Sequence, residues 1–241
     1  MQIAEFHTAE ESLASIKSSM DPSRAKQHLF LLRFETGRLE RDQLIRFALA
    51  WYHTARRHKE AFPVVVWNTL DDDVRFDLIE ILREEYGNGN RENIHARMLL
   101  RFLRALGIGD SDIRNAVLPA EIERFGREVL RIWKDSPPAR AFGLHFALEY
   151  LAAALHKHFA VGLEKYEFLK TADREYFDYH RVAEEQHADH SEAGYLYYAA
   201  DPQQRDLLDS GVRDGMSLLE SLWDAFNVYV FGTDDGTKIS N

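Results

Sequence analysis

The stretch HRVAEEQHADH, which begins at His180, spaces imidazoles and carboxylates as a metal site would. Each residue of an α-helix turns by about 100°, so His180, Glu184 and His187 lie on one face of a predicted helix. Two imidazoles and a carboxylate on one face are typical ligands of a transition metal. The same spacing also occurs on solvated polar helices, so the interpretation depends on partners elsewhere in the chain.

Glu149 is the best partner, because it lies within the strongly apolar stretch FGLHFALEYLAAALHKHF. Its predicted helix face also carries Phe146 and Ala152. A carboxylate on such a face is costly unless it is paired, hydrogen-bonded or bound to a metal. A buried ion pair with a distant arginine is the alternative. His145 and His156 flank the same face, either as groups that orient ligands or as ordinary core or surface histidines.

The segment REEYGNGNRENIH is the other source of ligands. Glu84 and Glu85 close one predicted helix, and His95 lies early in the next. The glycine turn between them allows a carboxylate and an imidazole to approach one point. Glu92 is a rival, because Glu92-x-x-His95 also has ligand spacing. Without the other segments, the paired glutamates would be interpreted as a solvated helix end.

The three segments together offer three carboxylates and three imidazoles, which is enough for two first-row divalent metals with open coordination positions. Two irons in such a site can bind and reduce O₂ without an organic cofactor. The predicted metal ligands are Glu85, His95, Glu149, His180, Glu184 and His187.

Composition limits the classes of protein and of site. The formal net charge is −10, which argues against non-specific binding to nucleic acid or to an anionic membrane surface. The chain of 241 residues has no cysteine, which excludes disulfides, thiolate zinc sites, Fe–S clusters and cysteine nucleophiles. A metal must therefore be held by His and carboxylate, a set that suits iron or manganese. The acidic N-terminal stretch has no apolar signal-peptide core, and no apolar run reaches the roughly 18 residues of a membrane span. We expect a cytoplasmic protein with a small-molecule substrate, and the sequence is compatible with a homodimer.

Helical periodicity runs through nearly the whole chain, and no segment shows the alternation of a strand. We expect an all-α protein with one helical metal-binding domain over residues 1–232 and a flexible tail over 233–241. Asp21 and Pro22 predict the start of a second helix, Gly37 its end, and Pro63 the end of a third. The β-branched run FPVVVWNTL is interpreted as a short buried helix. The predicted helices cover about residues 8–20, 21–37, 41–61, 71–86, 91–106, 120–134, 139–165, 173–198 and 201–230.

The order and spacing of these ligands resemble those of the haem-oxygenase-like diiron oxidases, a family related in fold to the TenA thiaminases and the PQQ-synthesis oxidase. The segment EEYGNGN-x4-H is similar to the form in the family's N-oxygenase members. The resemblance covers roughly residues 80–190. It implies a single bundle of about seven core helices that binds two iron ions and no haem.

Some positions depart from the family pattern. Glu184 stands where many members have Asp, which lengthens the arm of that ligand. The EYG triplet favours Glu85 as the first ligand, whereas a looser alignment favours Glu84 and an ExxH pair favours Glu92. Leu31 stands where one chlamydial member has a tyrosine that it consumes, which argues against self-sacrificing chemistry.

The resemblance implies an O₂-dependent non-haem diiron oxidoreductase that acts on a small amino-acid-like or carboxylate substrate. The implied reactions are N-oxygenation, C–C cleavage, desaturation or nitrile formation. The alternative is a ferritin-like iron-binding protein without substrate oxygenation, because the pairs Glu92/His95 and Glu184/His187 partly imitate that pattern. A TenA-like hydrolase would need a cysteine nucleophile, which the chain lacks.

Overall fold

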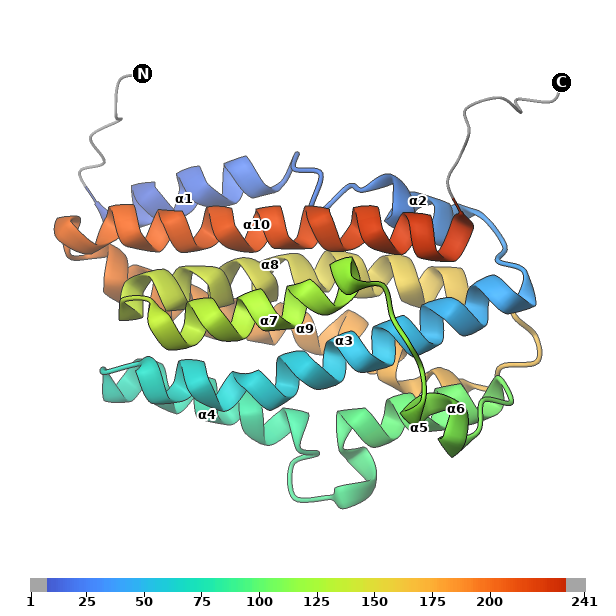
Figure 1. Cartoon of the computed structure of the whole chain (residues 1–241). Coiled ribbons are helices and arrows are strands. Elements are labelled where there is room, and N and C mark those ends of the chain that lie inside the picture. The colour runs from blue at the N-terminus through green and yellow to red at the C-terminus, as the bar shows by residue number, and fades with distance from the viewer. Residues whose placement is uncertain (1–7, 233–241) are drawn as a thin grey trace, which may run out of the picture.

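The computed structural model describes residues 8–232, and for residues 183–190 it describes the backbone but not the side chains. All regular secondary structure in the described range is helical (Figure 1). The elements are α1 (Ala9–Met20), α2 (Leu29–Thr36), α3 (Arg41–Asn68), α4 (Asp72–Glu85), the 3₁₀ turn η1 (Arg91–Asn93), α5 (His95–Ala105), α6 (Asp110–Arg114), α7 (Ala120–Asp135), α8 (Pro138–Leu163), α9 (Thr171–Ala199) and α10 (Pro202–Phe231).

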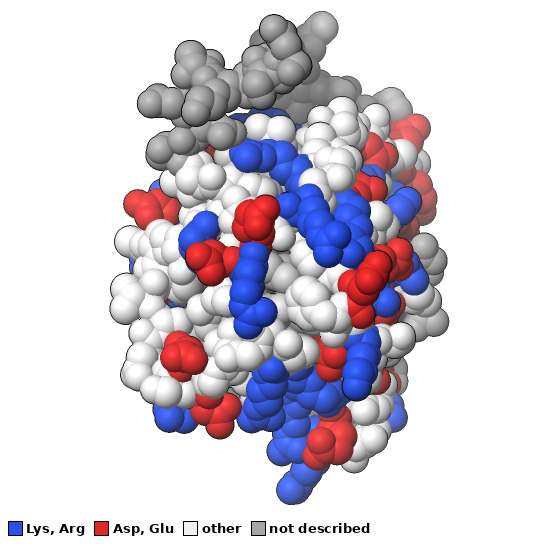
Figure 2. Space-filling view, turned by 90° about the vertical axis from the view of Figure 1, so that its right-hand side faces the viewer, with Lys and Arg blue, Asp and Glu red and all other residues white. Residues whose placement is uncertain are grey.

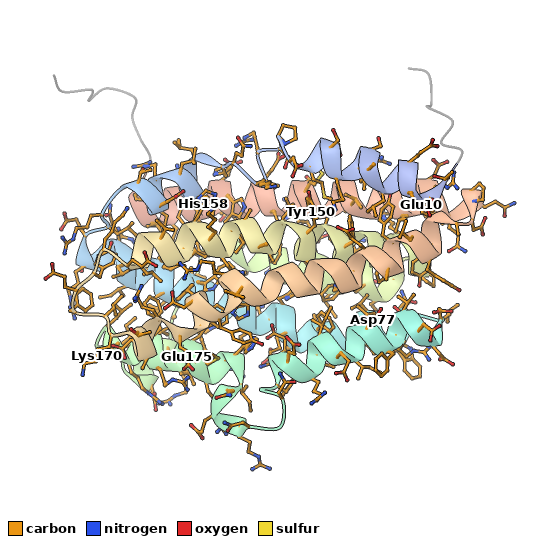
Figure 3. All side chains as sticks on the ribbon, turned by 180° about the vertical axis from the view of Figure 1, so that it is seen from behind. Glu10, Asp77, Tyr150, His158, Lys170 and Glu175 are labelled. Atoms are coloured by element: carbon orange, nitrogen blue, oxygen red, sulfur yellow. The ribbon has the colours of Figure 1, made fainter. Side chains whose placement is uncertain are left out.

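Helix α8 is the central element and packs most extensively against α9 and α10. It is buried on most of its circumference, as expected for a helix that is apolar all round. Gly143 and Gly211 allow the backbones of α8 and α10 to touch, because a Cβ at Gly211 would lie 2.0 Å from the carbonyl oxygen of Arg140. Figure 3 shows α9 beside α8 from behind, with α4 and α5 on the side away from α10.

A cluster of aromatic side chains fills the bundle where α2, α3, α8 and α10 meet. Each ring is almost fully excluded from solvent. The ring centroids of Phe34 and Phe47 are 4.4 Å apart, and those of Phe47 and Phe159 are 5.0 Å apart. Such tilted and edge-to-face contacts stabilise the core beyond simple burial. We call Phe30, Phe34, Phe47, Phe159, Trp223 and Phe226 the aromatic cluster.

Most of the predicted helices are confirmed. Thr8 and Glu11 form a capping box at the start of α1, where the first helix was expected to begin. Asp71 caps α4 through hydrogen bonds that its side chain accepts from the backbone N–H groups of Asp73 and Val74. The stretch FPVVVWNTL is helical up to Asn68, because the surrounding helical packing overrides the strand preference of its β-branched residues.

The predicted start of the second helix is wrong. Asp21 is not the N-cap of a second helix but the C-cap of α1, and its side chain accepts hydrogen bonds from Lys26 Nζ at 2.6 Å and Tyr150 Oη at 3.0 Å. Residues 21–28 form turns, and α2 is capped by His28, whose Nδ1 accepts a hydrogen bond from the backbone N–H of Phe30 at 3.1 Å. The end at Gly37 is confirmed.

The predicted end of the third helix before Pro63 is also wrong, because α3 continues to Asn68. Pro63 has no N–H to donate to the carbonyl of Lys59, which weakens the helix locally. Phe62 and Val65 are each only 1% exposed, and this burial on both sides of the proline keeps the helix continuous. Helix α6 was not predicted, because it spans only five residues.

The surface shown in Figure 2 carries Lys and Arg side chains interspersed with Asp and Glu. Exposed ion pairs include Arg104–Asp110 at 3.2 Å and Arg97–Glu92 at 3.0 Å. No helix of the described residues is both long enough and apolar enough to cross a membrane. The predicted flexible tail, residues 233–241, lies outside the described residues.

Candidate metal centre

The turn between α4 and α5 brings Glu85 and His95 together. Gly87, Asn88 and Gly89 all have positive φ angles, which reverse the chain within a few residues. A Cβ at Gly87 would lie 2.3 Å from a backbone carbonyl oxygen, so this position requires glycine. The result is a distance of 3.0 Å between Glu85 Oε1, at the end of α4, and His95 Nδ1, at the start of α5.

His180 reaches the same point from α9. Its Nδ1–H donates a hydrogen bond of 2.7 Å to the carbonyl oxygen of Tyr176, one turn earlier. Because a carbonyl only accepts, this bond assigns the proton to Nδ1 and leaves the lone pair of the neutral ring on Nε2. Nε2 lies 3.7 Å from Glu85 Oε1. A backbone carbonyl that orients an imidazole in this way is typical of metal-binding histidines.

Glu85, His95 and His180 form a compact, largely buried cluster. One potential ligand atom from each lies within 4.8 Å of the others. The buried Nδ1 of His95 makes no hydrogen bond to the described residues other than its 3.0 Å approach to Glu85 Oε1. A cation between these atoms would satisfy all three groups. The donor set of two nitrogens and one carboxylate suits iron or manganese.

The electrostatics of the cluster favour an ionised carboxylate. Burial by itself raises the pKa of Glu85, but the adjacent imidazoles of His95 and His180 hold that pKa well below its usual value. The lowered pKa of Glu85 favours its anionic form. An anionic carboxylate beside neutral imidazoles is the protonation state that a metal ligand requires.

Glu149 lies on the wall of the same cavity but is not one of the three clustered residues. It is 6% exposed, and its Oε1 lies 3.7 Å from Nδ1 of His145. The ring of His156 lies beside that of His180, with centroids 4.6 Å apart. Its Nδ1–H donates a hydrogen bond of 3.1 Å to the carbonyl oxygen of Ala152. Both histidines that the sequence placed near Glu149 are thus buried close to it or to the cluster.

The three rivals for the first carboxylate occupy different environments. Glu85 alone of the three joins His95. Glu84 accepts a hydrogen bond from Tyr179 Oη at 3.3 Å, and the Glu92 side chain is 77% exposed and pairs with Arg97. The backbone of α9 continues as a helix through residues 184 and 187, so both lie on this element. The side chains of Glu184 and His187 lie outside the described residues.

A cavity of about 100 Å³ opens beside the cluster at the centre of the bundle. Its walls are mostly apolar, and seven helices, α3, α4, α5, α7, α8, α9 and α10, contribute side chains to them. The apolar lining includes Leu99, Phe125, Leu148, Leu155, Leu219, Leu222 and Trp223. A buried cavity with a small polar cluster at one side has the composition typical of a small-molecule site.

The wall formed by α3 was missed by the sequence analysis. Trp51, Thr54 and Lys59 line the cavity, and each is at most 7% exposed. The apolar stripe of α3, continued from Trp51 at helical spacing, passes through residues 55, 58 and 62. Position 59 follows residue 55 by four residues and residue 58 by one, so it lies next to the buried face. Burial lowers the pKa of Lys59, an effect that the charge of Glu85 partly offsets.

Sequence comparison gives a family for the chain. The model of the family described as iron-containing redox enzymes matches residues 45–219. The chain belongs to this family. The matched range contains Glu85, His95 and His180, and their nitrogen and carboxylate donors fit the iron in the family's description. No curated protein matches the chain significantly.

Solved structures show what the fold is. A CADD-like protein of unknown function from Nostoc punctiforme superposes with a TM-score of 0.75 at 14% identity, covering 94% of this chain and 97% of that one. A TenA homolog from Pseudomonas syringae gives a TM-score of 0.74 at 12% identity, covering 94% and 95%. A domain with a heme oxygenase-like fold from Shewanella denitrificans gives 0.66 at 15% identity, covering 94% and 95%. This member of the iron-containing redox enzyme family therefore has the expected haem-oxygenase-like fold.

Proposed function

We propose that this protein is an O₂-dependent non-haem diiron oxidoreductase that oxidises a small amino-acid-like or carboxylate substrate. The observation that carries the proposal is the buried cluster of Glu85, His95 and His180, which opens onto an apolar cavity in a member of an iron-containing redox family. In the same proposal Glu149, Glu184 and His187 complete the ligands of two irons. The reaction is N-oxygenation, C–C cleavage, desaturation or nitrile formation.

Two irons, when bound, supply the ability to reduce O₂ without an organic cofactor. The residues of the chain then have three tasks. Glu85 provides negative charge, and the two imidazoles provide neutral donors, so that coordination positions stay open for O₂ and substrate. The hydrogen bond from His180 Nδ1 to Tyr176 holds Nε2 toward the cluster. The leucines and aromatic side chains of the cavity wall limit water near the reacting atoms.

Iron stoichiometry tests the metal site directly. Metal-free protein is loaded with Fe(II) under nitrogen and desalted, and the bound iron is measured with a colorimetric chelator. The wild type should retain about two irons per chain, and Glu85→Gln should lose at least half, because loss of a ligand's charge weakens binding by about tenfold or more. Glu84→Gln is the matched control, because this neighbouring carboxylate lies outside the cluster and should leave iron content unchanged.

Oxygen uptake then separates an oxidase from an iron store. The Fe(II)-loaded protein is mixed with O₂ in an electrode cell, alone and with a panel of carboxylic and amino acids. Uptake that continues past the bound iron only when one substrate class is present supports the proposal. Failure of the wild type to bind Fe(II), or full iron content and uptake in Glu85→Gln, would overturn it. A single burst equal to the bound iron with every compound would favour iron storage.

A further inference from the structure

Helix α3 presents hydrogen-bond donors to the cavity from the wall that carries no residue of the Glu85 cluster. Trp51 and Thr54 are each 6% exposed, and both line the cavity. The indole N–H of Trp51 and the hydroxyl of Thr54 have no hydrogen-bond partner among the described residues. A buried polar group without a partner costs about 1–3 kcal/mol, so two on one wall call for an explanation.

Lys59 adds a positive charge to this wall. It is 7% exposed and lines the same cavity. Its ammonium donates one hydrogen bond of 2.9 Å to the carbonyl oxygen of Glu85. An ammonium has three N–H groups. Nζ of Lys59 also lies over the ring of Tyr86, 4.4 Å from its centroid, and the structure gives it no second oxygen or nitrogen acceptor among the described residues. A buried lysine with donors to spare is complementary to an anionic acceptor.

The rest of the cavity restricts what the anion is attached to. The remaining lining is rich in leucine and aromatic side chains, which disfavour a second charged group. The carboxylates on the described lining are Glu85 and Glu149, both of which the proposed function assigns to metal, so a ligand ammonium would find no unengaged carboxylate there. A volume of about 100 Å³ is smaller than the roughly 150 Å³ that holds the six carbon atoms of benzene, so the aliphatic part of the ligand should have fewer than six carbon atoms.

We propose that Lys59 and Thr54 bind the carboxylate of a short-chain aliphatic monocarboxylate, whose chain lies against the leucines of the cavity. The indole N–H of Trp51 is the next donor along the same wall. This assignment rests on the proposed function in so far as Glu85 and Glu149 are occupied by metal. It narrows the substrate class from amino-acid-like or carboxylate compounds to monocarboxylates without an α-ammonium group.

The test is equilibrium binding, measured by isothermal titration calorimetry on the full chain, both metal-free and loaded with Fe(II) under nitrogen. The probes are hexanoate, 1-hexanol and norleucine. Hexanol keeps the apolar chain without the charge, and norleucine keeps the carboxylate and adds an ammonium. Wild-type protein should bind hexanoate at least about tenfold more tightly than either of the other two, because a hydrogen bond to a charged group has this magnitude.

Two variants locate the subsite. Lys59→Met keeps the length of the side chain and should weaken hexanoate about tenfold or more, while hexanol changes less than about twofold. Thr54→Val keeps the shape and should weaken hexanoate about threefold to tenfold. Lys134→Met, which removes an exposed lysine of α7, is the matched control and should bind all probes as the wild type does.

Lys59 also holds the end of α4, so a purely structural role must be distinguished. If Lys59 acted only through Glu85, its loss would weaken hexanoate and hexanol equally, and Thr54→Val would change neither; this result would overturn the proposal. Equal wild-type affinity for hexanoate and hexanol would also overturn it. Norleucine binding as tightly as hexanoate would overturn the restriction to monocarboxylates. If the protein binds iron but not hexanoate, the proposed carboxylate subsite is wrong and the proposed function is unaffected. If it binds hexanoate but not iron, the proposed metal function is wrong and the subsite is unaffected.

Discussion

The aromatic cluster and the cavity are neighbouring regions built by the same helices. Helix α3 places Phe47 in the aromatic cluster and Thr54 in the cavity two turns later. Helix α9 places Phe177 beside Phe159, with ring centroids 6.2 Å apart, and His180 at the metal cluster one turn later. Each helix thus changes from apolar packing to polar lining within a few residues.

The two regions differ in how completely their space is filled and their polar groups are hydrogen-bonded. In the aromatic cluster the rings fill the space between the helices and are almost fully buried. In the cavity, about 100 Å³ stays unfilled, and polar atoms of Trp51 and Thr54 have no hydrogen-bond partner among the described residues. Packed apolar surface stabilises the fold, whereas unsatisfied polar groups destabilise it unless a ligand or metal binds. We infer that the aromatic cluster supplies stability that the cavity does not.

The largest expected effect on stability comes from a substitution that disrupts the aromatic cluster. Phe159→Ala should lower the free energy of unfolding of the metal-free protein by about 3–5 kcal/mol, because it deletes a fully buried ring at the centre of the cluster. Guanidinium unfolding followed by circular dichroism measures this. Phe168→Ala, which truncates a ring that is 52% exposed, is the control and should change stability by less than about 0.5 kcal/mol. A loss below about 1 kcal/mol for Phe159→Ala would contradict the role assigned to the cluster.

A somewhat smaller effect tests the cavity side. Free Fe(II) at about one hundred times its dissociation constant should raise the free energy of unfolding by about 2.7 kcal/mol. His95→Gln should abolish most of this increase, measured against the metal-free form of the same variant, because it removes an imidazole donor of the cluster. The control His53→Gln alters a histidine that bonds the carbonyl of Ile113 outside the cavity and should keep the full increase. Equal metal-induced stabilisation in both variants would contradict the site.

The smallest expected effect concerns the helix that delivers Phe30 and Phe34 to the aromatic cluster. Burial lowers the pKa of His28, and its neutral Nδ1 caps α2 by accepting the N–H of Phe30. Because the folded-state pKa lies below the unfolded value, the unfolded chain binds the proton first as the pH falls. The capping contribution is therefore present above about pH 6.5 and is lost as the pH falls through the folded-state pKa.

The size of this effect is that of a helix cap, up to about 1 kcal/mol. Comparing unfolding free energies at pH 7.5 and pH 5 measures it. His28→Asn keeps an acceptor that does not titrate in this range and should reduce the pH dependence, whereas wild-type iron binding per folded chain should persist in the variant. An unchanged pH dependence in His28→Asn would show that the proton binds elsewhere.

The sequence alone determined the helical class and most helix boundaries. Thr8 with Glu11, Asp71 and Gly37 mark helix ends through local hydrogen bonds and backbone conformation, which do not depend on distant residues. Asp21 and Pro63 carry equally clear local signals and misled the prediction. At both positions tertiary contacts decided, through Tyr150 and Lys26 at Asp21 and through burial of the residues beside Pro63.

At the candidate site, the sequence determined which residue types are present and that residues 180, 184 and 187 share a helix face. It could not choose among Glu84, Glu85 and Glu92, because that choice depends on the positive φ angles of the turn after α4 and on the approach of α9. Nor could it place Thr54 and Lys59 on the cavity wall. The rotation of each helix about its axis is set by how all its side chains interlock with its neighbours, so only the packed bundle decides which polar groups face the same space.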